Sequence, residues 1–63
     1  MIYRYLDPGG DRLEIEGVAR GDDSFIAIDA YERRGTWTTI HVPLEQVDDL
    51  IAGIRNAAAN PAA

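Results

Sequence analysis

The chain has 63 residues, no cysteine and a formal net charge of −5, from eleven acidic and six basic residues. This length allows one domain, and the lack of cysteine excludes a disulfide framework or a thiolate zinc site. The negative charge disfavours nucleic acid as a partner, because binding to a phosphate backbone depends on clustered cations.

Four stretches carry the alternation or the β-branched and aromatic residues that are typical of strands: 2–6, 12–19, 24–32 and 36–42. The first ends at "DPGGD", where Pro8 and Gly9 suit the central positions of a type II turn. Gly17 interrupts the alternation of the second stretch, which predicts a bulge or a bend. Short turns, "RGDD" and "RRG", separate the remaining strands.

The period then changes to three and four residues, which predicts an amphipathic helix. Its apolar positions are Leu44, Val47, Leu50, Ile51 and Ile54. Pro43 suits the first helical turn, and Asn60-Pro61 ends the helix. Gly53 and Ala57 lie four residues apart, which favours either helix packing across a dimer or a tight fit of helix against sheet.

We therefore predict an α+β fold of the order β-β-β-β-α, with a four-stranded antiparallel β-meander and one C-terminal α-helix packed on one sheet face. Residues 1–59 form the domain and residues 60–63 a frayed tail. No apolar stretch is long enough to span a bilayer, and the start of the chain lacks the features of a secretory signal. A cytoplasmic protein without membrane association is expected.

Alternation divides the strand residues into two sets. The aliphatic set, expected to form the core with the helix, is Ile2, Leu6, Leu13, Ile15, Ile26, Ile28, Ile40 and Val42. The other set holds all five aromatic residues, Tyr3, Tyr5, Phe25, Tyr31 and Trp37. The first strand stays open to a slip of one residue, which would exchange its tyrosines for Ile2 and Leu6. Arg4 shares a face with Ile2 and Leu6, which suggests an edge strand.

One helix covers one face, so exposed aromatics on the other face would exceed the apolar patch of an ordinary monomer. We interpret that face as the surface of a homodimer or of a complex with a small protein partner. The residues assigned to it are Tyr3, Tyr5, Phe25, Tyr31 and Trp37, with Arg12 and His41 at the rim. Two alternatives stay open: the aromatics stack the bases of single-stranded nucleic acid, or they are scattered among polar neighbours. Glu14, Glu16 and Asp29 on the same face disfavour base stacking.

No pattern in the chain predicts an enzyme. Ser24 and His41 are the only serine and histidine, and no nucleophile turn surrounds Ser24. The aspartates of "DPGGD" and "GDD" lack EF-hand spacing and are typical of turns. We therefore expect no catalytic residue, no metal and no cofactor.

The whole pattern, "IYRY", "LEIE" and the helix after "HVP", resembles a group of short, uncharacterised actinobacterial proteins, which implies no particular activity. The strands followed by "LEQV" (44–47) are more loosely similar to the single-strand-binding transcriptional coactivator family, positive cofactor four. That resemblance implies four strands, a dimerising helix and a sheet that grips DNA. This chain departs from the family pattern at Val47, where an aromatic is usual, and at Glu14, Glu16 and Asp29, where basic residues are usual.

Overall fold

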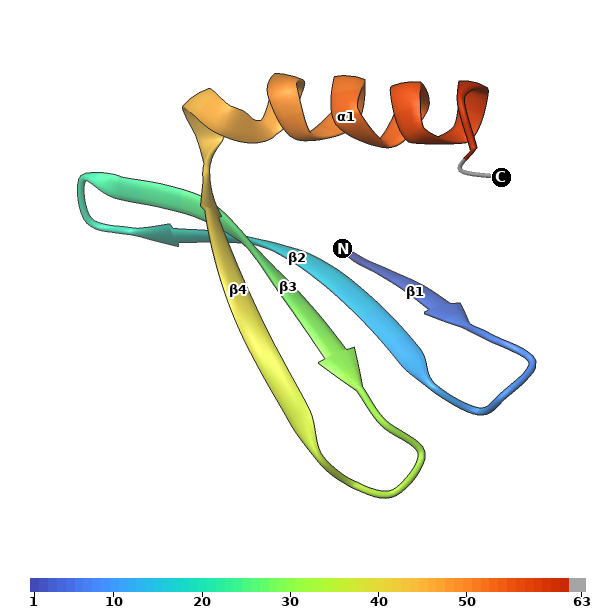
Figure 1. Cartoon of the computed structure of the whole chain (residues 1–63). Helices are drawn as coiled ribbons and strands as arrows, with labels where there is room; N and C mark the ends of the chain where they lie inside the picture. Colours follow the sequence, from blue (N-terminus) through green and yellow to red (C-terminus); the bar gives the residue numbers. More distant parts are fainter. Residues whose placement is uncertain (62–63) are drawn as a thin grey trace.

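The computed structural model describes residues 1–61. Four strands form one antiparallel sheet in the order β1-β2-β3-β4 (Figure 1). Their bounds are β1 (Ile2–Leu6), β2 (Arg12–Arg20), β3 (Asp23–Tyr31) and β4 (Trp37–Pro43). A 3₁₀ turn, η1 (Leu44–Gln46), leads directly into the helix α1 (Val47–Ala59). The predicted order β-β-β-β-α is confirmed.

The loop between β1 and β2 is not the type II turn that the sequence suggested. The N–H of Gly10 donates to the carbonyl of Asp7 at 3.1 Å, and Gly10 rather than Gly9 has a positive φ, of 92°. A type I turn followed by a left-handed glycine produces this pattern and suits a three-residue hairpin loop. The loop between β3 and β4 repeats the arrangement, with Gly35 (φ 102°) donating to the carbonyl of Glu32 at 2.9 Å.

The pairing of β2 with β3 runs without interruption from Arg12, opposite Tyr31, to Arg20, opposite Asp23. The bulge predicted at Gly17 is therefore wrong, because Gly17 pairs directly with Ile26 in the continuous register. The absence of a side chain, rather than an extra residue, interrupts the alternation there.

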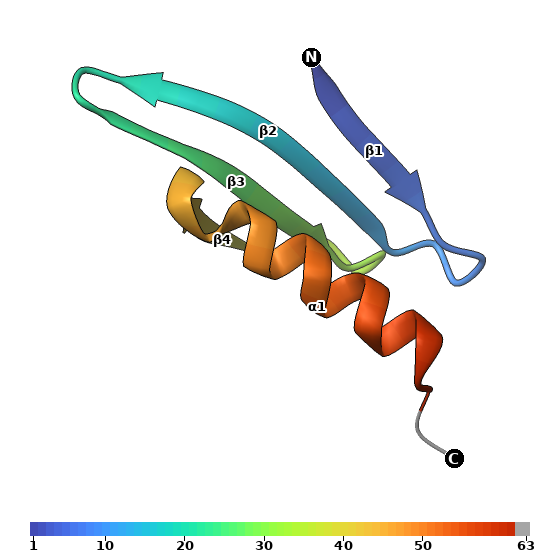
Figure 2. The same ribbon diagram turned by 90° about the horizontal axis from the view of Figure 1, so that it is seen from above.

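The helix lies over one face of the sheet, but the two diverge from the junction of β4 with η1 (Figures 1 and 2). Among residues 1–61 no hydrophobic side chain is buried, so the closed core expected between helix and sheet is not formed within one chain. The radius of gyration is 13.5 Å, whereas a compact chain of 63 residues has about 11 Å.

The ends of the helix follow from local hydrogen bonding. Pro43 ends β4 instead of beginning the helix, and η1 takes the next three residues. At the other end the N–H of Asn60 donates to the carbonyl of Asn56 at 2.9 Å, and the Asn60 amide donates to the Asn56 side chain at 2.9 Å. The last part of the predicted tail, 62–63, lies outside the described residues. No helix within residues 1–61 is long and apolar enough to cross a membrane.

Candidate interaction surface

The strand register decides which side chains share a face, because residues directly opposite each other across an antiparallel pair point the same way. Tyr3 is opposite Ile15, Ile15 is opposite Ile28, and Ile28 is opposite Ile40. The set that contains this row is called the aliphatic face. Its large members are Tyr3, Tyr5, Leu13, Ile15, Ile26, Ile28, Ile40 and Val42. The direction of a strand, the neighbouring strand to which a residue hydrogen-bonds and the L configuration together fix the side of the sheet to which its side chain points. With the strand directions of Figures 1 and 2, the aliphatic face lies on the side of the helix.

The other side of the sheet is called the mixed face. It carries Ile2, Arg4, Leu6, Arg12, Glu14, Glu16, Val18, Phe25, Ala27, Asp29, Tyr31, Trp37, Thr39, His41 and Pro43. Five of the seven residues assigned to the interaction face lie here, and the structure brings them onto one surface: Arg12, Phe25, Tyr31, Trp37 and His41.

The assignment of Tyr3 and Tyr5 to that same surface is wrong. The loop between β1 and β2 closes on the pair Asp7 and Asp11, whose backbone groups hydrogen-bond at 2.9 Å. This closure sets Tyr5 opposite Leu13 and so turns both tyrosines toward the aliphatic face. The alternative register for the first strand is the one that the structure adopts.

The centre of the mixed face is a network of paired polar groups. Arg4 and Arg12 each place Nε 3.1 Å from the same oxygen, Oε2 of Glu14. The Thr39 hydroxyl donates to the carboxylate of Asp29, which lies opposite it on β3. Arg4 therefore has an ion-pair partner on the same face, and it lies on an edge strand as its sequence context suggested.

The aromatics of the mixed face form two separate pairs. Tyr31 and Trp37 stack with ring centroids 5.9 Å apart, and the Arg12 guanidinium carbon lies 4.2 Å from the Tyr31 centroid. Phe25 and His41 lie toward the other end of β3 and β4, with centroids 4.7 Å apart. Asp29 and the polar network separate the pairs, so this face is not one continuous aromatic patch.

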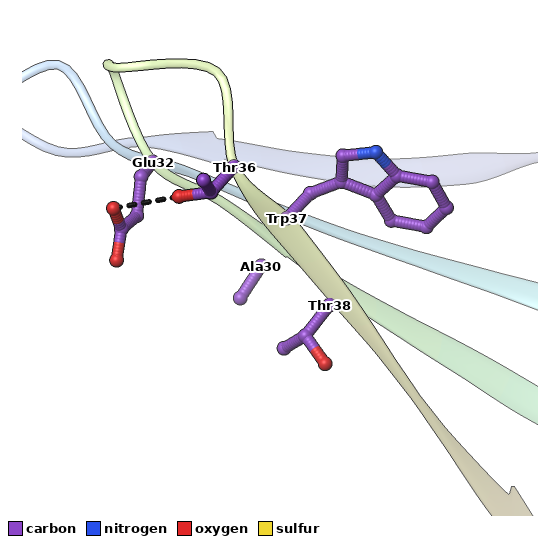
Figure 3. Close-up of a pocket in the computed structure, with 5 residues that line it drawn as sticks. All are labelled: Ala30, Glu32, Thr36, Trp37 and Thr38. Atoms are coloured by element: carbon purple, nitrogen blue, oxygen red, sulfur yellow. Dashed lines mark hydrogen bonds between the residues drawn. The ribbon is translucent and has the colours of Figure 1, made fainter.

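Figure 3 shows the two sides of β4 at its first residues, with Trp37 pointing away from Ala30 and Thr38. The hollow there is lined by Ala30, Glu32, Thr36, Trp37 and Thr38. The Thr36 hydroxyl donates to the carboxylate of Glu32 at 2.7 Å. The only carboxylate of this hollow is thus already hydrogen-bonded, which suits a loop-stabilising role.

The aliphatic face and the helix both leave apolar area in water. On the sheet, Val42 near the junction with η1 is half-buried, whereas Ile40, two residues further away, is 56% exposed. On the helix, Leu50 is half-buried, whereas Ile51 is 41% and Ile54 60% exposed. Leu44, at the junction itself, is also 53% exposed, so the apolar side chains of both surfaces are incompletely covered along the length of the helix and of β4.

The residues considered for chemistry do not converge. Ser24 pairs with Ala19 and points to the aliphatic side, whereas His41 is opposite Ala27 and points to the mixed side. Within one chain these two side chains cannot act on the same atom. Residues 1–61 contain no group of three or more His, Asp or Glu side chains placed to hold a metal ion.

Comparison of the chain with protein-family models, curated proteins and solved structures found no match in any of the three. The surfaces are therefore interpreted from their own geometry. That geometry separates a mixed face whose central polar groups are paired from an aliphatic face and a helix whose apolar side chains lack cover.

Proposed function

We propose that this chain is a non-enzymatic protein-interaction module that works as a homodimer, and that the two copies build one shared core from their aliphatic faces and helices. The observation that carries the proposal is the absence of a buried hydrophobic side chain within residues 1–61, although 46% of the sequence is hydrophobic. Burial of apolar area is the main force that stabilises a fold, and one copy of this chain provides little of it.

The exposed area gives the size of the missing interface. The chain exposes 5401 Å², whereas a folded monomer of 6.9 kDa exposes about 4,000 Å². The difference, about 1,400 Å² per copy, corresponds to an interface of about 2,800 Å² when two copies cover each other. Interfaces of that size are typical of obligate homodimers, which resemble a domain core divided between two chains.

A second copy is the partner that fits this surface without further assumptions. Each copy offers both an aliphatic sheet face and an apolar helix side, so two copies related by a twofold axis supply complementary surfaces. Helical spacing places Asp48 and Asp49 on the side of α1 away from Val47, Leu50 and Ile54. The large residues of the aliphatic face are uncharged. Joining two copies through the apolar side of α1 and the aliphatic face therefore leaves these two carboxylates outside the contact.

In the proposed dimer, the residues assigned to the interaction face from the sequence lie on two different surfaces. Tyr3 and Tyr5 belong to the dimer interface, with exposed fractions of 58% and 50% in the single chain. Arg12, Tyr31 and Trp37 remain on the outer surface of the dimer, where a further protein partner can reach them. The cytoplasmic location stays a prediction from the sequence.

Sedimentation equilibrium over a concentration series tests the proposal. We expect a particle of twice 6.9 kDa at low micromolar concentration. Far-UV circular dichroism on the same samples should show that dilution below the dissociation constant removes secondary structure, because the single copy lacks a core. A folded particle of 6.9 kDa at high micromolar concentration would refute the homodimer.

A further inference from the structure

The junction between sheet and helix determines where the helix can go. β4 ends at Pro43, η1 occupies Leu44–Gln46, and α1 begins at Val47, so no loop residue separates strand from helix. Pro43 has φ −59°, which its ring fixes, and Gln46 and Val47 both have backbone angles in the right-handed helical region. η1 also lies against β3. Few backbone bonds are therefore free to turn the helix.

From this junction the helix and the sheet diverge (Figures 1 and 2), and the angle between α1 and the aliphatic face is called the wedge. Its narrow end is at η1, where Val42 and Val47 are half-buried. Further from the junction along the chain, Ile40 on β4 and Ile54 on α1 are 56% and 60% exposed. For the helix to close on its own sheet, one of the few backbone torsions at Pro43 and η1 would have to change.

The shape of the helix suits the aliphatic face of a second copy. Its large apolar residues end at Ile54, and its last turn is built from Ala57, Ala58 and Ala59. In an antiparallel arrangement the slender alanine end of one helix lies near the junction of the other copy. The isoleucines then lie further along the aliphatic face. Two copies that each receive the other's helix in this way satisfy a twofold axis.

We infer that the homodimer forms by exchange of helices: α1 of each copy packs with its apolar side on the aliphatic face of the other. This inference rests on the proposed homodimer and specifies its partner element. A short connection that cannot fold back favours such exchange over closure within one chain.

Cysteine cross-linking tests the exchange, since the native chain has no cysteine. The variants Ile28→Cys and Ile54→Cys each carry one cysteine, on the aliphatic face and on the helix. An equal mixture of the two variants is refolded together from denaturant and treated with a short bis-maleimide. This reagent links two cysteines whose distance or orientation does not allow a disulfide. We expect a link between chains that joins the tryptic peptides 21–33 and 35–55, identified by mass spectrometry.

A matched control uses Ala27→Cys, which lies next to Ile28 on β3 but points to the mixed face. Mixed with Ile54→Cys, it should lose the link between chains. The double variant Ile28→Cys/Ile54→Cys, treated at the same concentration, should also link between chains rather than within one.

The outcomes separate the two proposals. A link confined to single chains of the double variant, or equal linking by Ala27→Cys, would overturn helix exchange. If the same samples then had a dimeric mass, the homodimer would be retained, with its helices arranged differently from the proposed exchange. A monomeric mass would remove the homodimer itself.

Discussion

Ile40 and Trp37 provide a direct comparison of the two faces of the sheet. Both lie on β4, and in the single chain both are more than half exposed, Ile40 at 56% and Trp37 at 62%. Ile40 points to the aliphatic face and Trp37 to the mixed face. If the chain acted alone, replacing the larger aromatic side chain would remove more apolar contact than replacing Ile40.

The proposed dimer reverses that order. Truncating a buried isoleucine to alanine costs about 2 kcal/mol at the lower end of the observed range, and a symmetric dimer contains the change twice. Ile40→Ala should therefore weaken dimerisation by about 4 kcal/mol, or about 1,000-fold. Trp37→Ala, on the outer surface, should change the dissociation constant by less than about tenfold, corresponding to about 1.4 kcal/mol.

Sedimentation equilibrium measures both dissociation constants without relying on the fluorescence of Trp37, the only tryptophan. Circular dichroism at a concentration well above each dissociation constant checks that the variants retain the fold. A weaker dimer for Trp37→Ala than for Ile40→Ala would show that the mixed face, and not the aliphatic face, joins the two copies. The reasoning from exposed area would then be refuted.

Three further results are expected. Gly10→Ala should lower the free energy of unfolding by at least about 1 kcal/mol, because Gly10 has φ 92° and a Cβ there would lie 2.8 Å from Cδ of Arg33. The control Gly53→Ala, where a Cβ would have nothing within 4 Å, should instead stabilise the protein by up to about 1 kcal/mol. Equal effects of the two variants in thermal unfolding would contradict this account. Glu14→Gln should cost about 1 kcal/mol in urea unfolding because two arginines pair with that carboxylate, and an unchanged midpoint would show that the network is not stabilising. An oligothymidine should leave Trp37 fluorescence unquenched even at low salt, and salt-sensitive quenching would restore the single-strand-binding alternative.

Strand positions were predictable because alternation and turn residues are local signals. The structure has β1 at the expected residues, β2 is one residue longer at its end, and β3 and β4 are each displaced by one residue, as in Trp37–Pro43 against 36–42. The fold order followed from these signals and from the change of period after Pro43.

The face assignment of β1 was not predictable from alternation, which separates Tyr3 and Tyr5 from Ile2 and Leu6 but cannot say which pair turns toward the helix. That choice depends on how the loop closes. Pairing of Asp7 with Asp11 across three loop residues fixes it, and the Asp11 N–H donates to the Asp7 side chain at 3.0 Å. A turn of a different length would exchange the two faces of β1.

The direction of the helix relative to the sheet is, like the face assignment of β1, a property that cannot be predicted from the spacing of apolar residues. The spacing of Val47, Leu50 and Ile54 identifies an apolar side, and the structure has a helix there. The angle at which the helix leaves the sheet depends instead on two or three backbone torsions at Pro43 and η1. A prediction of a closed core treats this angle as free to adjust, whereas the direct junction of strand and turn restricts it.

These two properties together explain how a correct list of elements leads to a core that one chain does not close. Exchange of helices leaves one helix for each sheet. The core of the proposed dimer therefore uses the apolar residues that the sequence assigned to the core, except that Tyr3 and Tyr5 take the place of Ile2 and Leu6. The exchange changes only the direction from which the helix arrives. The interface is then the domain core itself, and dilution should remove folding and association in one step, because neither half of the core is buried without the other.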